Sequence, residues 1–224
     1  MFDTGYSDVY CRNASHAGID LNDVDVIAIS HFHRDHTRGL LDHPFTSKKK
    51  IVLHPRVLTA VLDSKDQSIL DDYAAIQRTI AGDFAIKTAT TPYELTEGAF
   101  FHGEIPRVTD FEKGRFLDDP MIDDTALAFR TPDGVVVVSG CSHAGICNIC
   151  EYAKTVTGQK LYAVIGGFHL LHSEEPPIDE TIAYFRDENP THVMPMHCVD
   201  FDIQARFQIE FNGARPGSGS LIQL

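Results

Sequence analysis

Four side chains of types that bind metals stand within six positions of this chain: His31, His33, Asp35 and His36. They directly follow an apolar run at residues 24–30 that is rich in β-branched residues, which are enriched in strands. We expect this run to be a buried strand that carries the polar cluster at its carboxyl end. In open α/β folds, binding sites lie at that end of the strands. The cluster therefore predicts an α/β fold and the edge of the sheet at which its site forms.

These four side chains cannot all reach one ion, because neighbouring residues in a short segment point in diverging directions. Two adjacent ions, roughly 3.5–4 Å apart as in two-metal hydrolytic centres, remove this difficulty. We predict that His31 and His33 bind one ion and that Asp35 and His36 bind the other. Imidazole and carboxylate ligands favour zinc first, then iron or manganese. The alternative of incidental polar loop residues is disfavoured, because the whole chain has only 12 histidines in 224 residues.

The rest of the chain alternates between strand-like and helix-like patterns, which favours one α/β domain over residues 1–224. A chain of this length buries roughly 70% of its unfolded surface in a single core. A hairpin is expected where Asp133-Gly134 separates two apolar runs, because Asp-Gly is a strong turn signal. Expected strands cover residues 24–30, 51–54, 84–91, 125–131, 135–139, 161–165 and 192–196, and expected helices cover residues 62–80, 144–156 and 178–189.

A second arrangement of strand and ligand follows residues 135–139, where the apolar run ends in Gly140-Cys141-Ser142-His143. We predict that His143 supplies a third imidazole to the first metal. Further on, Cys147 and Cys150 are three residues apart in an apolar stretch, with no second such pair in the chain. A structural role for them is therefore favoured over a zinc or redox role.

Charge and composition exclude several classes of partner. The formal net charge of −13 and the isoelectric point near 5.2 argue against nucleic acid, which is bound by clustered Lys and Arg. No run of about 18 apolar residues and no export signal is visible, so we expect no membrane partner. Five cysteines without compact disulfide spacing fit a reducing compartment. We therefore expect a cytoplasmic protein acting on a small-molecule substrate.

The segment from His31 to His36 resembles the HxHxDH signature of the metallo-β-lactamase superfamily. With four further motifs, the chain resembles along essentially its whole length a narrower branch, the dihydropterin-ribofuranosylaminobenzene-phosphate synthase-like metal-dependent hydrolases. The resemblance implies an αββα sandwich, in which two mixed sheets face each other with helices outside and the metal site at one edge. The four motifs are Asp3-Thr4-Gly5, Gly140-Cys141-Ser142-His143, Gly166-Gly167-Phe168-His169-Leu170 and Met194-Pro195-Met196-His197-Cys198.

The resemblance also implies roles for individual residues. His197 resembles the last histidine of the family and would complete the shell of the second metal with Asp35 and His36. Cys141 stands where many members place a metal-bridging aspartate, and it is either a thiolate ligand or a buried, unligated thiol. Asp3 resembles a carboxylate that orients the ligand loop by hydrogen bonding.

Three more side chains are candidates for handling the substrate. His169 follows two glycines that permit close backbone approach, and we expect it to contact substrate, donate a proton or bind metal, with a packed histidine as the alternative. Asp35 is expected to orient or deprotonate the attacking water in addition to binding metal. Arg107 lies in a segment that resembles a family motif near the site and is a candidate contact for an anionic substrate.

Three functions follow from this reading. The favoured one is a hydrolase in which two divalent cations activate water against a small, anionic ester, lactone or phosphate. The alternatives are a pterin-type transferase with the same metal centre, as the name of the branch implies, and a non-catalytic metal-binding remnant. The metal-binding remnant is suggested because the chain starts at Met1, without the strands that relatives place before the Asp3 motif. The sheet edge left exposed would favour a homodimer that covers it.

Overall fold

The computed structural model of this chain describes residues 1–213 and 216–223. It divides into two compact units, Met1–Thr90 and Thr91–Leu224. Each unit combines one sheet with helices, so the predicted α/β class is confirmed. That the whole chain forms a single domain stays a prediction. Across the described part of the chain, none of the helices combines the length and the apolar composition that a membrane span requires.

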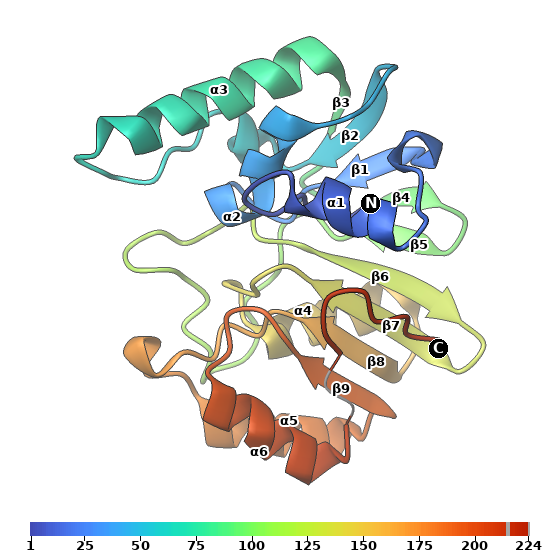
Figure 1. Cartoon of the computed structure of the whole chain (residues 1–224). Coiled ribbons are helices and arrows are strands. Elements are labelled where there is room, and N and C mark those ends of the chain that lie inside the picture. Colours follow the sequence, from blue (N-terminus) through green and yellow to red (C-terminus); the bar gives the residue numbers. More distant parts are fainter. Residues whose placement is uncertain (214–215, 224) are drawn as a thin grey trace. The chain divides into compact units, whose positions relative to one another are not determined.

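The first unit is built on a parallel sheet in the strand order β1-β2-β3 (Figure 1). The three strands fall on predicted apolar runs, whereas the sequence does not predict α1. Within the described residues, the strands are β1 (Val26–Ala28), β2 (Lys49–Leu53) and β3 (Phe84–Thr88), the helices are α1 (Val9–His16), α2 (Arg34–Thr37) and α3 (Gln67–Asp83), and the 3-10 turns are η1 (Leu21–Asp23), η2 (Arg38–Asp42) and η3 (Pro55–Leu58).

The long helix α3 starts later than the predicted residue 62, and its cap explains why. The Asp66 side chain accepts a hydrogen bond from the Ser68 N–H at 2.9 Å, which satisfies one of the free N–H groups of the first turn. The buried residues Tyr73, Ile76 and Ile80 recur at helical spacing and form the packed face of the helix. At the sheet edge, β3 is exposed over residues 85–88. The homodimer expected to cover such an edge stays a prediction.

The second unit contains a mixed sheet in the order β4-β5-β6-β7-β8-β9. The strands from β4 to β7 pair in antiparallel fashion, and β7, β8 and β9 are parallel. The hairpin predicted at Asp133-Gly134 is confirmed, since β6 and β7 meet there. The described elements are β4 (Tyr93–Thr96), β5 (Ala99–Phe101), β6 (Ala126–Thr131), β7 (Gly134–Ser139), α4 (Ile146–Thr157), β8 (Leu161–Gly166), η4 (His172–Glu174), α5 (Ile178–Glu188), β9 (His192–Pro195) and α6 (Phe201–Phe211).

The core of the second unit packs the apolar residues of β6, β7 and β8 with those of the three helices. An aromatic group of Phe168, Phe185 and Phe207 lies within it, with ring centroids 5.7–6.2 Å apart. Cys147 and Cys150 are buried on α4 as free thiols, which agrees with the structural role predicted for them. This packing fixes the sheet whose strand ends carry the candidate site residues.

Candidate metal centre

In the first unit, the predicted cluster lies at the carboxyl end of β1 and continues into α2. His31 and His33 follow the strand in an extended segment, and α2 then begins, so Asp35 and His36 lie on a helical turn rather than in a loop. The turn folds the chain back on itself. The His31 Nε2 atom is 3.1 Å from His33 Nδ1, and the rings of His31 and His36 are 4.2 Å apart between centroids. Three imidazoles therefore converge in this unit.

The Asp3 carboxylate contacts two residues of this segment, Ser30 and His36. Its Oδ1 atom accepts a hydrogen bond from the Ser30 N–H, and its Oδ2 atom accepts one from the Ser30 hydroxyl, each at 2.7 Å. The same Oδ2 atom lies 2.7 Å from His36 Nδ1, and Ser30 Oγ lies 2.8 Å from His31 Nδ1. Because both Nδ1 atoms are engaged, Nε2 is the nitrogen of each ring that could bind an ion. This is the geometry expected of the orienting role predicted for Asp3.

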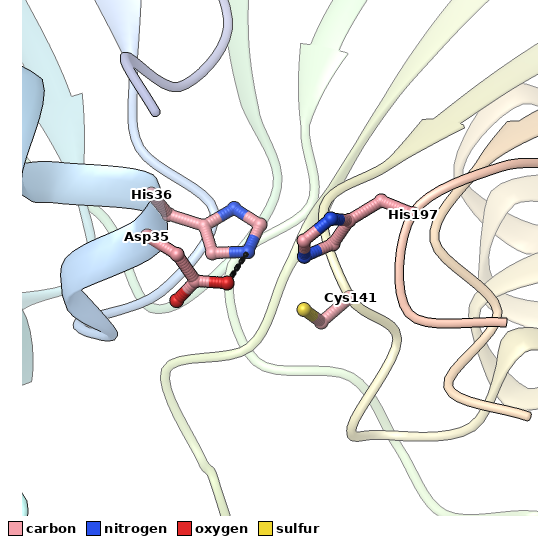
Figure 2. A group of neighbouring side chains, drawn as sticks. All are labelled: Asp35, His36, Cys141 and His197. Carbon is pink, nitrogen blue, oxygen red and sulfur yellow. Dashed lines mark ion pairs between the residues drawn. The ribbon is translucent and has the colours of Figure 1, made fainter. Parts of the chain in front are cut away.

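The charge around His36 is strongly negative. Burial of its ring opposes protonation, but the Asp3 and Asp35 carboxylates outweigh burial and raise the pKa of His36 to about 10. Asp35 Oδ2 is 3.4 Å from His36 Nε2, an ion pair that Figure 2 shows. Two carboxylates that attract a proton to this imidazole would equally attract a divalent cation, whose binding displaces protons.

In the second unit, the candidate residues follow the carboxyl ends of three neighbouring parallel strands. Cys141 and His143 follow β7, His169 follows β8, and His197 follows β9. Because parallel strands end at one edge of a sheet, these side chains are brought together. The rings of His143 and His169 are 4.2 Å apart between centroids, and Cys141 Sγ lies within 4.8 Å of a ring nitrogen of His197 (Figure 2).

Two glycines at the end of β8 allow its loop to lie against the loop that follows β7. A Cβ atom on Gly166 would lie 2.2 Å from the Ser139 carbonyl oxygen, and one on Gly167 would lie 2.1 Å from the Gly140 carbonyl oxygen. Only glycine permits such approaches. The Ser142 hydroxyl then donates to the Gly167 carbonyl at 2.5 Å. The close approach predicted from these glycines is confirmed, and it places His169 beside His143.

Two buried carboxylates, which the sequence analysis does not single out, hold the segment around His143. Asp124 accepts a hydrogen bond from the Ala144 N–H at 2.8 Å, and Glu112 accepts from the N–H groups of Cys147 and Asn148, each at 2.8 Å. Glu112 therefore caps the first turn of α4. Burial is the main cause that raises the pKa of both, to about 7 for Asp124. An Asp or Glu within a polar loop gives no sequence signal of this role.

A cavity of about 50 Å³ in the second unit opens beside His143 and His169. Its wall combines apolar side chains with the cations Lys113 and Arg115. Arg107 does not line it: its guanidinium donates to the backbone carbonyls of Ile105, Gly114, Pro120 and Met121, and so ties together the segment around the cavity. The substrate contact suggested for Arg107 stays a prediction. The cavity is lined by Glu112, Lys113, Gly114, Arg115, Ser142, His143, Gly145, Phe168, His169, Leu170, Glu174, Pro176 and Pro177.

One thiol beside the predicted residues is also absent from the sequence-based set. Cys198 follows His197 directly, has a positive φ of 48°, and donates through Sγ to the Cys141 carbonyl oxygen at 3.4 Å. Burial opposes its ionisation, but contacts with the side chains of Cys141 and His169, and the charge of nearby His197, lower the pKa of Cys198. Because Cys198 directly follows the candidate ligand His197, its place in the sequence could have identified it as a residue of the site.

The donors of each unit fit a divalent transition metal. Imidazole nitrogens, a carboxylate and a thiol are the ligand types that zinc takes, and imidazole and carboxylate also suit iron and manganese. The fit is supported by the orienting contacts of the Asp3 carboxylate, because metal-binding histidines usually donate their second ring nitrogen to a carboxylate or a carbonyl.

No protein-family model matches the chain. The chain is 30% identical over 233 residues to the 7,8-dihydropterin-6-methyl-4-(beta-D-ribofuranosyl)-aminobenzene-5'-phosphate synthase of Methanocaldococcus jannaschii, and the match covers 94% of this chain and 79% of that protein. The crystal structure of Tm1679, a metal-dependent hydrolase of the β-lactamase superfamily, is similar over 100% of this chain and 88% of that one, with a TM-score of 0.82 and 28% identity.

A more distant structure shares the fold alone. The isothiocyanate hydrolase from Delia radicum gut bacteria has a TM-score of 0.54 at 13% identity, over 92% of this chain and 78% of that one. The histidine and glycine motifs thus occur in a chain whose fold and sequence both match known proteins nearly end to end. This chain belongs to the metallo-β-lactamase superfamily, in the branch that includes the archaeal synthase.

Proposed function

We propose that this protein is a dinuclear metal-dependent hydrolase that attacks a small, anionic ester, lactone or phosphate with activated water. The observation that carries the proposal is the pair of contacts that Asp3 and Ser30 make to the Nδ1 atoms of His36 and His31. Such contacts hold two imidazoles by their Nδ1 atoms before any ion binds, so that Nε2 is the nitrogen left to each ring for an ion, which is how metal sites are pre-organised. A histidine cluster with a merely structural role needs no such support.

The ligands of each ion in this proposal are those that the resemblance to the superfamily implies. Cys141 is available to the second ion as a thiolate. The first ion takes His31, His33 and His143, and the second takes Asp35, His36 and His197. When bound there, two divalent cations, zinc or else iron or manganese, supply a water of lowered pKa and polarise the group attacked.

The side chains of the protein carry out the remaining steps. Asp35, on the first turn of α2, orients the attacking water and accepts its proton. His169, beside the cavity, holds a proton on a ring nitrogen and transfers it to the leaving group. The apolar wall formed by Phe168 and Leu170 excludes water from the substrate body.

The test is elemental metal content and turnover on protein purified without chelators or a polyhistidine tag. We expect about two transition-metal equivalents per chain, and metal-dependent release of nitrophenol from nitrophenyl phosphate or acetate. His33→Ala should lose metal and turnover. His172→Ala is the matched control, because that exposed ring pairs with the exposed carboxylate of Asp202. Full activity of His33→Ala would overturn the assignment.

A second candidate function rests on the name of the archaeal relative, which is a synthase. A pterin-type transferase would use the same ligands and release pyrophosphate only when a pterin substrate is present. Hydrolysis of simple esters without pterin favours the hydrolase, and pyrophosphate release that depends on pterin favours the transferase. Bound metal without either reaction would favour a non-catalytic metal-binding protein.

A further inference from the structure

We propose that Cys141 and Cys198 form a reversible disulfide when the protein is exposed to hydrogen peroxide. This bond removes the Cys141 thiol from the candidate metal centre. Formation of the bond depends only on the second unit. Its effect on metal and turnover rests on the proposed function.

The Cys198 thiol lies against the backbone of Cys141, where the loops that follow β7 and β9 meet. Cys198 Sγ is 3.4 Å from the carbonyl oxygen of Cys141. They are 57 residues apart in the chain, so the fold brings them together. Neither is in a disulfide in this structure.

The backbone keeps the space between the two cysteines open. A Cβ atom on Gly167 would lie 2.8 Å from Cys198 Sγ and 3.0 Å from the Cα atom of Cys141, so any side chain at this position would displace the thiol. Cys198 itself has a φ of 48°, in the left-handed region that residues other than glycine rarely adopt. Its carbonyl accepts a hydrogen bond from the Leu170 N–H at 3.1 Å, which anchors this backbone.

The other cysteines are poorer partners for oxidation. Cys147 and Cys150 are enclosed in α4, and burial raises the pKa of both thiols well above the usual range. The thiolate is the form that reacts, so these two react slowly. Cys11 belongs to the first unit, on α1. The pair formed by Cys141 and Cys198 is therefore the one selected within the second unit.

The reaction balances with hydrogen peroxide as oxidant. The Cys198 thiolate attacks one peroxide oxygen, the O–O bond breaks, and a sulfenic acid and hydroxide form. The Cys141 thiolate then attacks the sulfenic sulfur, the S–O bond breaks, and a second hydroxide leaves. Two thiols are oxidised, one peroxide is reduced to two waters after proton transfer, and dithiothreitol reverses the change by thiol exchange.

The test is peptide mapping of the full, metal-loaded protein after titration with hydrogen peroxide and blocking with N-ethylmaleimide. Trypsin cleavage gives residues 131–154, which hold Cys141, Cys147 and Cys150, and residues 187–206, which hold Cys198. We expect a link between these two peptides that dithiothreitol removes. It should persist in the double variant Cys147→Ser/Cys150→Ser and be absent from both Cys141→Ser and Cys198→Ser.

Metal content is followed in the same samples. Formation of the link should release about one metal equivalent, because Cys141 is no longer a thiolate, and peroxide should release less metal from Cys198→Ser. Failure to form the link, or a link confined to residues 131–154, would overturn the proposal. If no sample turns over any substrate, the mapped link still decides this proposal, while the proposed function fails separately.

Discussion

The Oδ2 atom of Asp3 lies 2.7 Å from the Nδ1 atom of His36, although 33 residues separate them in the chain. We expect Asp3→Asn to weaken metal binding by about 10–100-fold, because an amide orients the imidazole less well and adds no charge. Competition with a chelating dye measures this affinity. Asp71→Asn, at an exposed position of α3, is the control and should bind metal as the unmodified protein does. Equal affinities for the two variants would contradict the orienting role.

Glu112 caps α4 through two backbone N–H groups, each at 2.8 Å. Glu112→Gln keeps one acceptor oxygen but loses the charge that favours a helix N-terminus. We expect the free energy of unfolding to fall by about 1–2 kcal/mol, as measured in urea. The exposed Glu97→Gln should change it by less than about 0.5 kcal/mol. A neutral result for Glu112→Gln would show that the capping charge adds nothing to stability.

His102 is fully buried in the second unit, and neither ring nitrogen has a hydrogen-bond partner among the described residues. Burial lowers its pKa to about 3, whereas the unfolded chain has the ordinary value near 6.5. Between these values the unfolded state binds a proton that the folded state does not. The free energy of unfolding should therefore fall with acidification below pH 6.5, by about 1.4 kcal/mol per pH unit from this residue.

Urea unfolding between pH 7 and pH 5 measures this slope. His102→Leu should lower the slope by about 1.4 kcal/mol per pH unit, while His16→Leu, at an exposed position of α1, should leave it unchanged. Identical slopes for the two variants would rule out His102 as the source of the acid sensitivity.

Gly167 lies so close to Gly140 that a Cβ atom would be 2.1 Å from a carbonyl oxygen. Gly167→Ala should lower the free energy of unfolding by about 1–3 kcal/mol and shift the loop that carries His169. Gly82→Ala is the control, since nothing lies within 4 Å of its added Cβ atom and alanine favours the helix. Thermal unfolding compares the two, and a Gly167→Ala protein as stable as Gly82→Ala would contradict the close approach.

Much of this fold could be predicted from local pattern. The strands that carry candidate ligands are apolar runs that end in a polar motif, and the Asp-Gly turn fixed one hairpin. The short strands β4 and β5 were missed, because three or four residues carry too little alternation to stand out. α1 buries none of its residues and α6 only Ile203 and Phe207, so their apolar faces are weak signals.

The sequence identifies the candidate ligands but not the contacts that support them. His31, His33 and His143 stand in motifs, whereas Ser30 and Glu112 act through contacts with residues distant in the chain. The position of α2 was also missed, because a four-residue helix is set by its packing and capping more than by its propensity. Long-range polar contacts have no period, so only the folded chain identifies them.

Adjacent strands of a sheet are spaced by about 4.8 Å, and β7, β8 and β9 each carry one loop of the candidate site at this spacing. The spacing of the strands therefore sets the distance between the points at which these loops begin, whatever the sequences of the loops. One loop can be lengthened or exchanged without moving the anchor points of the other two. The loop after β8 carries no proposed metal ligand, so its replacement can change the molecules that the protein accepts while His143 and His197 keep their positions.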